Sequence, residues 1–249
     1  MTESVNDALT TLDEQRFWKS DGWANGFPFD NRWAGEAISF SEQGMTITLS
    51  SDSINYNSVL EYQSGELRSH HFYGYGCYEI ELRPILADGV VTAFFLFAGP
   101  HDAPDDGNGK HNEIDIEFLG YDTKVMQINY WTNDDRYVNE HAELIPLPFD
   151  ASLDFHRYAI NWQKDHISWM VDGDVVKTVA NRSGDPTPSA SDSKLKVMLN
   201  LWITDQRVSA WAGKFDKSST REHQAAFRNF RYTPSLYCLS EDVLPKTQK

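Results

Sequence analysis

Gly109-Lys-His-Asn-Glu-Ile-Asp-Ile-Glu-Phe-Leu-Gly120 alternates between acidic and apolar side chains from Glu113 to Phe118. In a β-strand, successive side chains point to opposite faces of the sheet. The three acids therefore share one face, whereas Ile114, Ile116 and Phe118 share the other and point into a core. This stretch predicts a strand with one polar face and one buried face.

The same period-two alternation recurs along most of the chain. Turn signals such as Asp88-Gly89 and Asp172-Gly173 separate these stretches at intervals of about ten residues, which is typical of a sandwich or barrel. No convincing amphipathic helix is found that is longer than the stretch formed by the first dozen residues of the chain. The sequence therefore predicts an all-β, single-domain sandwich. The clearest alternating stretches are residues 45–49, 78–82, 125–131 and 167–171.

Composition and charge exclude several classes of partner. The 249 residues include 22 Lys and Arg against 37 Asp and Glu, a net charge of −15, so we expect no nucleic-acid partner. No stretch approaches the ~20 consecutive apolar residues that cross a bilayer, so we expect no membrane partner either. The two cysteines, Cys77 and Cys238, cannot form a framework of several bridges, and their number leaves open whether they pair.

The acidic face of the quoted strand has the spacing of a catalytic pair. At ~3.3 Å per residue, the Cα atoms of Glu113 and Glu117 lie about 13 Å apart, yet side chains that lean together bring their carboxyl groups to ~5–6 Å. Retaining glycosidases hold their two carboxyl groups about 5–5.5 Å apart. Like-charge repulsion around Asp115 raises at least one pKa of the triad and allows a proton to be shared.

Two other interpretations of the acidic face stay open at this point. The face could simply be solvated, as charged side chains usually are. Alternatively, His111, Glu113 and Asp115 could offer nitrogen and oxygen ligands to Ca²⁺ or Mn²⁺ in a lectin-like sandwich. Chelation separates the lectin from the hydrolase, because a metal-dependent lectin loses binding in EDTA whereas a two-carboxylate hydrolase keeps cleaving.

Flanked by His-Asn and Phe-Leu-Gly, Glu113-Ile-Asp-Ile-Glu117 resembles the active-site strand of glycoside hydrolase family 16, specifically its bacterial lichenase-like branch of endo-β-1,3-1,4-glucanases. The resemblance extends over most of the chain, for instance through Tyr73-Gly-Tyr-Gly76 and residues 127–133. It implies a curved, concanavalin A-like jelly roll with substrate along a concave cleft. It also implies that Glu113 is the nucleophile, Glu117 the general acid/base and Asp115 a helper carboxylate, an order that the spacing alone does not give.

The resemblance further implies a set of substrate-binding residues. Their chemistry suits sugars, because aromatic rings lie against pyranose faces while amides and acids bind hydroxyls. These residues are Asn25, Glu61, Gln63, Phe95, His111, Asn129, Trp131, Trp202 and Trp211. Aromatic residues at inward strand positions more often belong to a core, which is how we interpret Trp162 and Trp169.

Four positions depart from the pattern of lichenases or of the wider family. His111-Asn112 stands where lichenases have Trp-Asp, and a histidine at that place is seen in the xyloglucan and succinoglycan branches. Gln63 stands where we align a lichenase arginine. Many family members bind a structural Ca²⁺ through an aspartate that falls at Arg228 here, and because a guanidinium cannot ligate a cation we expect no metal at that site.

These observations combine into one set of expectations. We expect an N-terminal extension over 1–15, a catalytic jelly roll over 16–232 and a C-terminal tail over 233–249. We expect a retaining endo-β-glucanase that hydrolyses internal bonds of a neutral β-glucan, above all mixed-linkage β-1,3-1,4-glucan, with no cofactor and no metal. The alternatives are a xyloglucan- or succinoglycan-active hydrolase or transglycosylase of the same family, and a non-catalytic lectin-like sandwich. The expected protein is a secreted monomer that binds polysaccharide, although residues 1–12 lack the pattern of a signal peptide.

Overall fold

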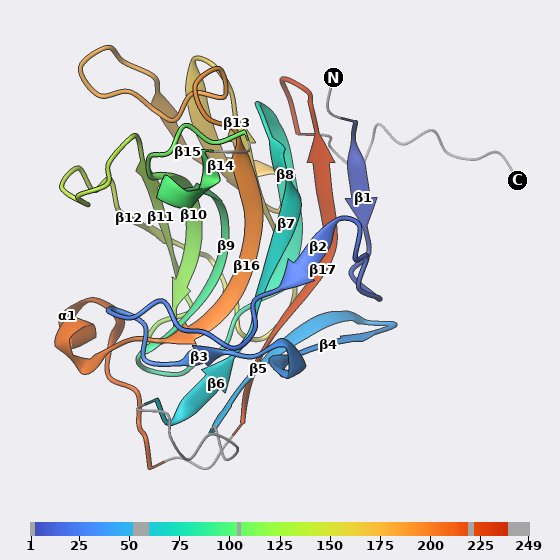
Figure 1. Ribbon diagram of the computed structural model, residues 1–249, viewed down its shortest axis with the longest axis vertical. Helices are drawn as coiled ribbons and strands as arrows, with labels where there is room; N and C mark the ends of the chain where they lie inside the picture. The colour runs from blue at the N-terminus through green and yellow to red at the C-terminus, as the bar shows by residue number, and fades with distance from the viewer. Residues whose placement is uncertain (1–2, 52–59, 104–105, 219–221, 239–249) are drawn as a thin grey trace, which may run out of the picture.

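The computed structural model describes residues 3–51, 60–103, 106–218 and 222–238. Within these ranges, two curved β-sheets stack face to face (Figure 1). Helical turns are short and few in the described ranges: η1 (Gly35–Ala37), η2 (Pro100–Asp102), η3 (Gln206–Val208) and α1 (Ser209–Ala212). The all-β sandwich expected from the alternation is confirmed.

We call the sheet that contains the acidic strand the inner sheet. In the described part of the chain it has seven strands, in the order β12 (Glu143–Pro146), β11 (Val125–Trp131), β10 (Asn112–Leu119), β9 (Val90–Ala98), β16 (Leu195–Ile203), β7 (Glu66–Tyr73) and β2 (Phe17–Lys19). Strand β10 thus lies between β9 and β11, with both of its edges paired.

The second sheet, which we call the outer sheet, has ten strands among the described residues. Its main order is β15 (Asp174–Ala180), β14 (His166–Val171), β13 (His156–Trp162), β8 (Gly76–Arg83), β17 (His223–Thr233), β5 (Gly44–Ser51), β6 (Tyr62–Ser64) and β3 (Arg32–Trp33). Strand β4 (Ile38–Ser41) pairs with β5, and β1 (Val5–Asp7) pairs with β17. The segment expected as an N-terminal extension therefore adds a strand to the sandwich, and Leu9 just after it is buried.

The hydrophobic core lies between the two sheets. Ile114, Ile116 and Phe118 of β10 are fully buried there, as the alternation predicts. Trp162 and Trp169 project into the same core from the outer sheet and are also fully buried, which confirms their interpretation as core residues. The indole Nε1 of Trp169 donates a hydrogen bond to the backbone carbonyl of Asp115 at 2.9 Å. The core thus fixes the acidic strand from behind.

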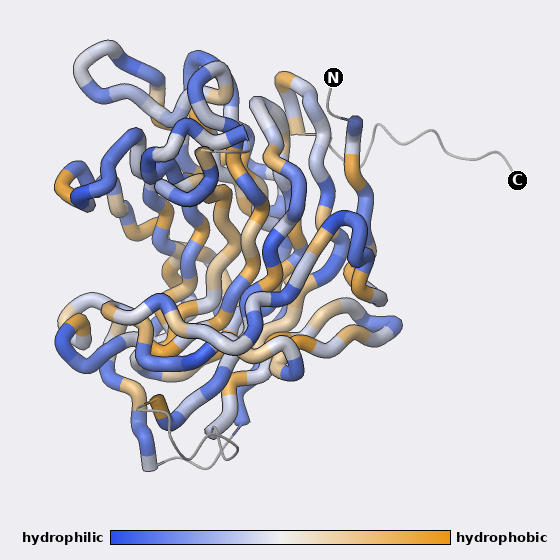
Figure 2. Tube along the Cα trace, in the orientation of Figure 1, coloured by the Kyte–Doolittle hydropathy of each residue, from blue (hydrophilic) through white to orange (hydrophobic). Residues whose placement is uncertain are grey.

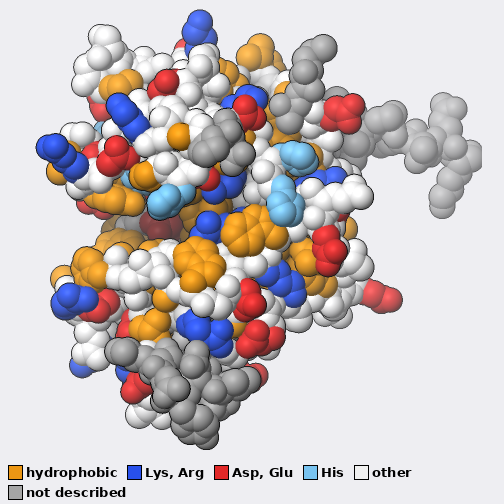
Figure 3. All heavy atoms as spheres, viewed as in Figure 1, with side chains coloured by type: hydrophobic (Ala, Val, Ile, Leu, Met, Phe, Trp, Pro, Cys, Tyr) orange, Lys and Arg blue, Asp and Glu red, His pale blue; other side chains and the backbone are white. Residues whose placement is uncertain are grey.

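The other face of the inner sheet is concave and carries a second, separate apolar cluster. Val91, Ala93 and Phe95 of β9 and Met198 and Trp202 of β16 belong to it, whereas their sequence neighbours point into the main core. Apart from Thr92, β9 consists of apolar residues, and the tube view shows hydrophobic colours through the middle of the molecule, where the strands of the two sheets lie (Figure 2). In the space-filling view, the molecule is hollowed on the side where β10 and β11 lie (Figure 3).

Two covalent and local features complete the frame. Asp172 and Gly173 have positive φ values of 49° and 94° and connect β14 to β15 in the two-residue hairpin that their sequence predicts. The cysteine pairing that composition left open is resolved, because Cys77 of β8 forms a disulfide with Cys238. The bridge joins positions 161 residues apart and ties the end of the described chain to the outer sheet.

Candidate active site

Strand β10 presents its three acids on the concave face. Because the strand pairs in regular register on both edges, each acid has a fixed neighbour on either side. Glu113 lies between Phe97 and Trp131, and Asp115 lies between Phe95 and Asn129. The third acid, Glu117, lies between Ala93 and Gln127. The alternation of one strand therefore lines up three carboxyl groups over an aromatic and amide floor.

Asp115 occupies the centre of the acidic row and is 4% exposed. Burial, followed by the charges of Glu113 and Glu117 and a hydrogen bond with Glu113, raises the pKa of Asp115 well above its ordinary value. The raised pKa favours the protonated form of Asp115, which can donate this hydrogen bond to Glu113.

Glu117 carries the chemistry of a proton donor. Burial and the charge of Glu113 raise its pKa to about 7, although the amide of Gln127, which donates to its Oε2 at 2.6 Å, favours the charged form and limits the rise. At the other end of this amide, Oε1 of Gln127 accepts a hydrogen bond from the Nε1 of Trp211 at 2.9 Å. Trp211 thereby fixes which end of the amide faces Glu117.

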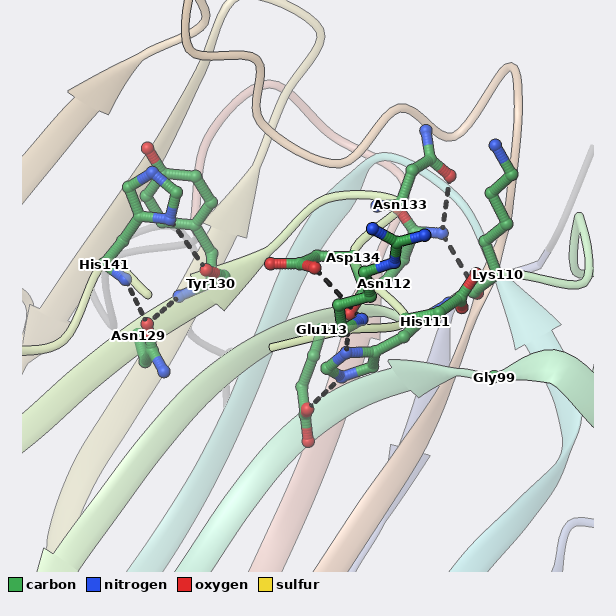
Figure 4. A network of polar contacts seen from close by, with 12 residues as sticks. Gly99, Lys110, His111, Asn112, Glu113, Asn129, Tyr130, Asn133, Asp134 and His141 are labelled. Carbon is green, nitrogen blue, oxygen red and sulfur yellow. Dashed lines mark hydrogen bonds and ion pairs between the residues drawn. The ribbon is translucent and has the colours of Figure 1, made fainter. Parts of the chain in front are cut away.

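Glu113 has a different partner. Its Oε2 lies 2.6 Å from Nε2 of His111, a residue that is 2% exposed (Figure 4). Burial alone lowers the pKa of His111, but the hydrogen bond and charge of Glu113, together with the Asp134 carbonyl, outweigh burial and raise it. The environments of Glu113 and Glu117 thus differ, because the first lies beside an imidazole whose pKa is raised and the second beside a neutral amide.

The floor beside the acids is aromatic. Trp202 packs against Phe29 with ring centroids 4.1 Å apart and against Trp211 at 6.0 Å. Phe95 belongs to the same cluster. Trp131 packs instead near His111, with ring centroids 5.8 Å apart. Such rings offer flat apolar surfaces of the kind that pyranose rings stack on.

Amide groups frame this floor. Asn129 is 4% exposed, and its Oδ1 accepts hydrogen bonds from the backbone N–H groups of Tyr130 and His141, so its Nδ2 points away from them (Figure 4). Asn25 accepts a hydrogen bond from Nε1 of Trp33, a member of the concave cluster. The structure therefore brings Asn25, Asn129, Phe95, His111, Trp131, Trp202 and Trp211 to the same face as the three acids.

Comparison with known proteins fits this geometry. The family model described as "Glycosyl hydrolases family 16" matches residues 25–222. The chain belongs to glycosyl hydrolase family 16. This family-16 enzyme is 36% identical over 211 residues to a beta-glucanase of Paenibacillus polymyxa, covering 84% of this chain and 80% of the relative. It is 37% identical over 202 residues to a beta-glucanase of Bacillus subtilis strain 168, covering 80% and 75%.

Solved structures agree with the sequence relatives. The enzyme superposes on the Bacillus licheniformis beta-glucanase with a TM-score of 0.80 and 32% identity, covering 93% of this chain and 98% of that one. A beta-1,3-1,4-glucanase (lichenase) from a mouse hindgut metagenome gives a TM-score of 0.81 and 32% identity, covering 94% and 100%. The chain is therefore a glycoside hydrolase with the jelly-roll fold of this family.

Two expected cleft residues do not lie in the cleft of this family-16 enzyme. Glu61 and Gln63 lie before and within β6, a strand of the outer sheet. The side chain of Glu61 is 68% exposed and lies 3.6 Å from Lys217, while Gln63 accepts a hydrogen bond from Arg32 at 2.7 Å. The expectation that Glu61 and Gln63 lie beside the acids is therefore wrong, because β6 belongs to the outer sheet.

Glu66 and Arg68 of β7 take their place on the concave face. Arg68 pairs in register with Met198, and Glu66 accepts a hydrogen bond from Nδ2 of Asn200 at 3.2 Å. The sequence contained a signal, because Glu66-Leu-Arg68-Ser ends three residues before Tyr73-Gly-Tyr-Gly76 and holds the arginine that Glu61-Tyr-Gln63-Ser lacks. Gln127 was also missed as a site residue, although it lies opposite Glu117 in the alternation of β11.

The alternative of a metal site finds no geometric support in the described residues, where no group of three or more His, Cys, Asp and Glu side chains is placed to hold an ion. Nε2 of His111, which such a site would use, faces Glu113 instead. At the position of the family's calcium ligand, Nε of Arg228 binds Glu81 at 2.6 Å. No described helix is long and apolar enough to span a membrane.

Proposed function

We propose that this enzyme is a retaining endo-β-glucanase that cleaves a neutral β-glucan, with mixed-linkage β-1,3-1,4-glucan as its preferred substrate. The observation that carries the proposal is that the three acids of β10 have different environments. Asp115 and Glu117 have raised pKa values, while Glu113 lies against His111. Pairs of carboxyl groups whose environments push their pKa values apart are typical acid–nucleophile pairs.

In the proposed double displacement, protonated Glu117 gives its proton to the glycosidic oxygen as the bond to the anomeric carbon breaks. The carboxylate of Glu113 attacks that carbon and forms a covalent glycosyl-enzyme. Glu117, now ionised, takes a proton from a water molecule, and this water releases the sugar from Glu113. Asp115 keeps its proton throughout and donates its hydrogen bond to Glu113, so that it helps to disperse charge on the nucleophile when the sugar leaves.

Three observations support a neutral β-glucan as substrate. The aromatic floor suits apolar pyranose faces, and the net charge of −15 repels a polyanionic glycan at long range without affecting an uncharged one. The relatives at 36–37% identity are named beta-glucanases. His111 and Asn112, where lichenases carry Trp-Asp, keep xyloglucan and succinoglycan as alternatives, and a sugar acceptor in place of water would turn the same intermediate toward transglycosylation.

The test is parallel incubation with lichenan, laminarin, xyloglucan and succinoglycan, followed by sizing of the fragments and proton NMR of the first product. We expect lichenan to fall rapidly to fragments of intermediate size whose new reducing ends are first the β-anomer. Preferential cleavage of another glycan would contradict the substrate, and a first product in the α-form would contradict retention. Longer products in the presence of excess oligosaccharide acceptor would mark a transglycosylase.

The assignment of roles within the pair has its own test. Glu113→Gln should abolish turnover. Glu117→Ala should slow substrates with poor leaving groups far more than aryl glycosides with good ones, because poor leaving groups need the proton most. Added azide should restore the rate of Glu117→Ala by replacing water in the second step. Equal losses on both kinds of substrate would count against Glu117 as the acid.

We also propose that the enzyme works outside the cell as a monomer. The disulfide between Cys77 and Cys238 supports export, because such bridges persist in oxidising compartments. Mass spectrometry of the protein purified from its native source should find no free thiol, and light scattering after gel filtration should give the mass of one chain. Two free thiols, or a dimer mass, would remove the respective proposal.

A further inference from the structure

His111 is held in a position where both of its ring nitrogens face hydrogen-bond acceptors. Nδ1 lies 3.1 Å from the backbone carbonyl oxygen of Asp134, which can only accept, so Nδ1 carries a hydrogen. Nε2 lies 2.6 Å from the carboxylate oxygen Oε2 of Glu113. An ionised Glu113 also only accepts, so Nε2 must then carry a second hydrogen and the ring must be an imidazolium.

The loop that follows β11 fixes this arrangement. The backbone N–H of Asp134 donates to the carbonyl of His111 at 3.0 Å, so the two residues are joined by a pair of reciprocal bonds. The carboxylate of Asp134 accepts from the backbone N–H groups of Arg136, Val138 and Asn139, which holds the loop in shape. The Asp134 carbonyl is therefore a rigid acceptor rather than one that turns away when the ring loses a proton.

Aromatic rings enclose the imidazole. The Tyr137 ring centroid lies 4.5 Å from that of His111, and the rings of Phe97 and Trp131 lie at 5.7 and 5.8 Å. Their faces favour a cation over a neutral ring. The imidazole is only 2% exposed, so its charge would interact with Glu113 more strongly than in bulk water.

We propose that His111 is a cationic positioning residue whose imidazolium keeps the nucleophile Glu113 ionised and aimed while Asp115 holds the proton between the two carboxyl groups. This inference rests on the proposed role of Glu113. Without the cation, Glu113 competes more strongly with Asp115 for that proton, and a protonated Glu113 cannot attack. When the ring loses its proton at higher pH, the Nε2 lone pair faces the carboxylate and the pair repels.

The charged and titratable groups around the ring agree with this assignment. Glu113 contacts the ring from β10, and Asp115 is hydrogen-bonded to Glu113. From the loop after β11, the Asp134 carbonyl contacts the ring and the Asp135 carboxylate accepts from the backbone N–H of His111. The hydroxyl of Tyr137 is kept neutral, because burial and the nearby acids raise its pKa. Lys196 of β16 lies beyond Phe97, where its charge is paired with Asp102 at 2.8 Å. The cation beyond Phe97 is therefore already paired with its own acid.

The decisive experiment measures how fast Glu113 is labelled as a function of pH. The probe is a 2-deoxy-2-fluoro β-oligoglucosyl fluoride, whose fluoride leaves with little help from an acid, so that labelling depends on ionised Glu113 rather than on protonated Glu117. The adduct is detected by the mass of the intact protein and located by peptide mapping. If wild-type enzyme forms no adduct on Glu113, the proposed function fails and the inference about His111 fails with it.

With the wild-type adduct in place, three variants test His111 itself. His111→Phe keeps a ring without a donor, and we expect the acidic limb of the labelling profile to move upward by about 1 pH unit, with labelling slowed about tenfold at pH 5.5. His111→Gln keeps an N–H donor without the charge. Its labelling should be faster than that of His111→Phe, but the acidic limb of its pH profile should stay at the higher pH. His156→Phe, which removes a histidine paired with Asp172 on the outer sheet, should leave the profile unchanged. If the acidic limb of the labelling profile of His111→Phe lies at the same pH as in the wild type, the proposal is overturned, however fast or slow the labelling is.

NMR of the histidine rings gives a readout that needs no turnover. The His111 signal, identified by its absence in His111→Phe, should titrate above the ordinary 6.5 in the wild type. In Glu113→Gln it should titrate about 1 unit or more lower, because the carboxylate that holds the proton is gone. The same midpoint in both proteins would show that Glu113 and His111 do not share a charge-assisted bond, and would refute the inference.

Discussion

Single side chains set the protonation of this active site, and each does so through one identifiable contact. Glu113 and Glu117 are chemically the same residue on the same face of β10, yet His111 lies beside the first and Gln127 beside the second. The alternation of the sequence indicated that the acids share a face. It could not indicate their partners, because Gln127 lies on a neighbouring strand and the Asp134 carbonyl that orients His111 belongs to a loop.

Removal of the amide beside Glu117 should move the alkaline limb of activity. Because the Gln127 amide favours the charged form of Glu117, Gln127→Met should raise the pKa of Glu117 above its present value of about 7. We expect the alkaline limb of kcat/KM to move to higher pH. Trp211→Phe, which frees the amide to rotate, should have a smaller effect in the same direction. A shift to lower pH in Gln127→Met would contradict this account of the hydrogen bond.

Replacement of Asp115 should increase the free energy of unfolding and lower kcat. The pKa of Asp115 is raised in the folded protein, so its contribution to stability is present below its unfolded pKa and is lost as pH rises toward the folded value. Asp115→Asn removes this penalty, and at pH 7 it should increase the free energy of unfolding by on the order of 1 kcal/mol while it lowers kcat. Denaturation by urea at pH 4 and pH 7 measures the first effect. The gain should shrink at pH 4, and a gain of equal size at both pH values would exclude a titration effect.

Strands were more predictable than the alignment of particular residues within them. The four alternating stretches named from the sequence all lie in strands, in β5, β8, β11 and β14, because period-two burial is a local property. The choice between Glu61 and Glu66 was not local. Both precede a short polar run, and although Arg68 offered a clue in the sequence, the sheets to which β6 and β7 belong show which of them faces the acids. Strand β1 was missed because its three residues are too few to show a period.

The two candidate positions make opposite predictions for binding. Arg68 lies on the concave face between the rings of Trp18 and Trp23, at 5.3 and 4.7 Å from their centroids. Arg68→Met should raise the KM for lichenan about tenfold, which corresponds to about 1.4 kcal/mol, because it removes a donor and loosens both rings. Gln63→Ala on the outer sheet should leave KM unchanged. The reverse pattern in steady-state kinetics would restore the original alignment.

At the scale of the whole molecule, composition indicated a globular protein but not which distant parts of the chain are joined. A net charge of −15 and a large apolar fraction were sufficient to expect a globular protein without nucleic acid. The pairing of Cys77 with Cys238 depends on a contact across 161 residues, which no count of cysteines can reveal. Nearby, Asn161 and Gln163 donate hydrogen bonds to the carbonyls of Leu236 and Ser235 and so hold the end of the described chain.

Loss of the disulfide should affect stability and leave catalysis intact. We expect Cys77→Ser with Cys238→Ser to lower the free energy of unfolding by about 2–4 kcal/mol, because the unfolded chain gains the freedom that the bridge removes. The value of kcat on lichenan at 25 °C should be unchanged, since both cysteines lie outside the inner sheet. Urea titration of oxidised and reduced protein gives the first quantity. An equal midpoint for both forms would mean that the tail is held by its other contacts alone.

The hydrogen bond from Trp169 to the main chain at Asp115 makes the two layers of the sandwich depend on each other. In the proposed function a glycan contacts only the concave side of β10, yet the other side of that strand is held by an indole from the outer sheet. A change in the outer sheet can therefore displace the three acids even when the residues that line the concave face stay the same. Loss of turnover on heating should thus coincide with melting of the rear layer, and no half-folded form should remain able to cut its polymer.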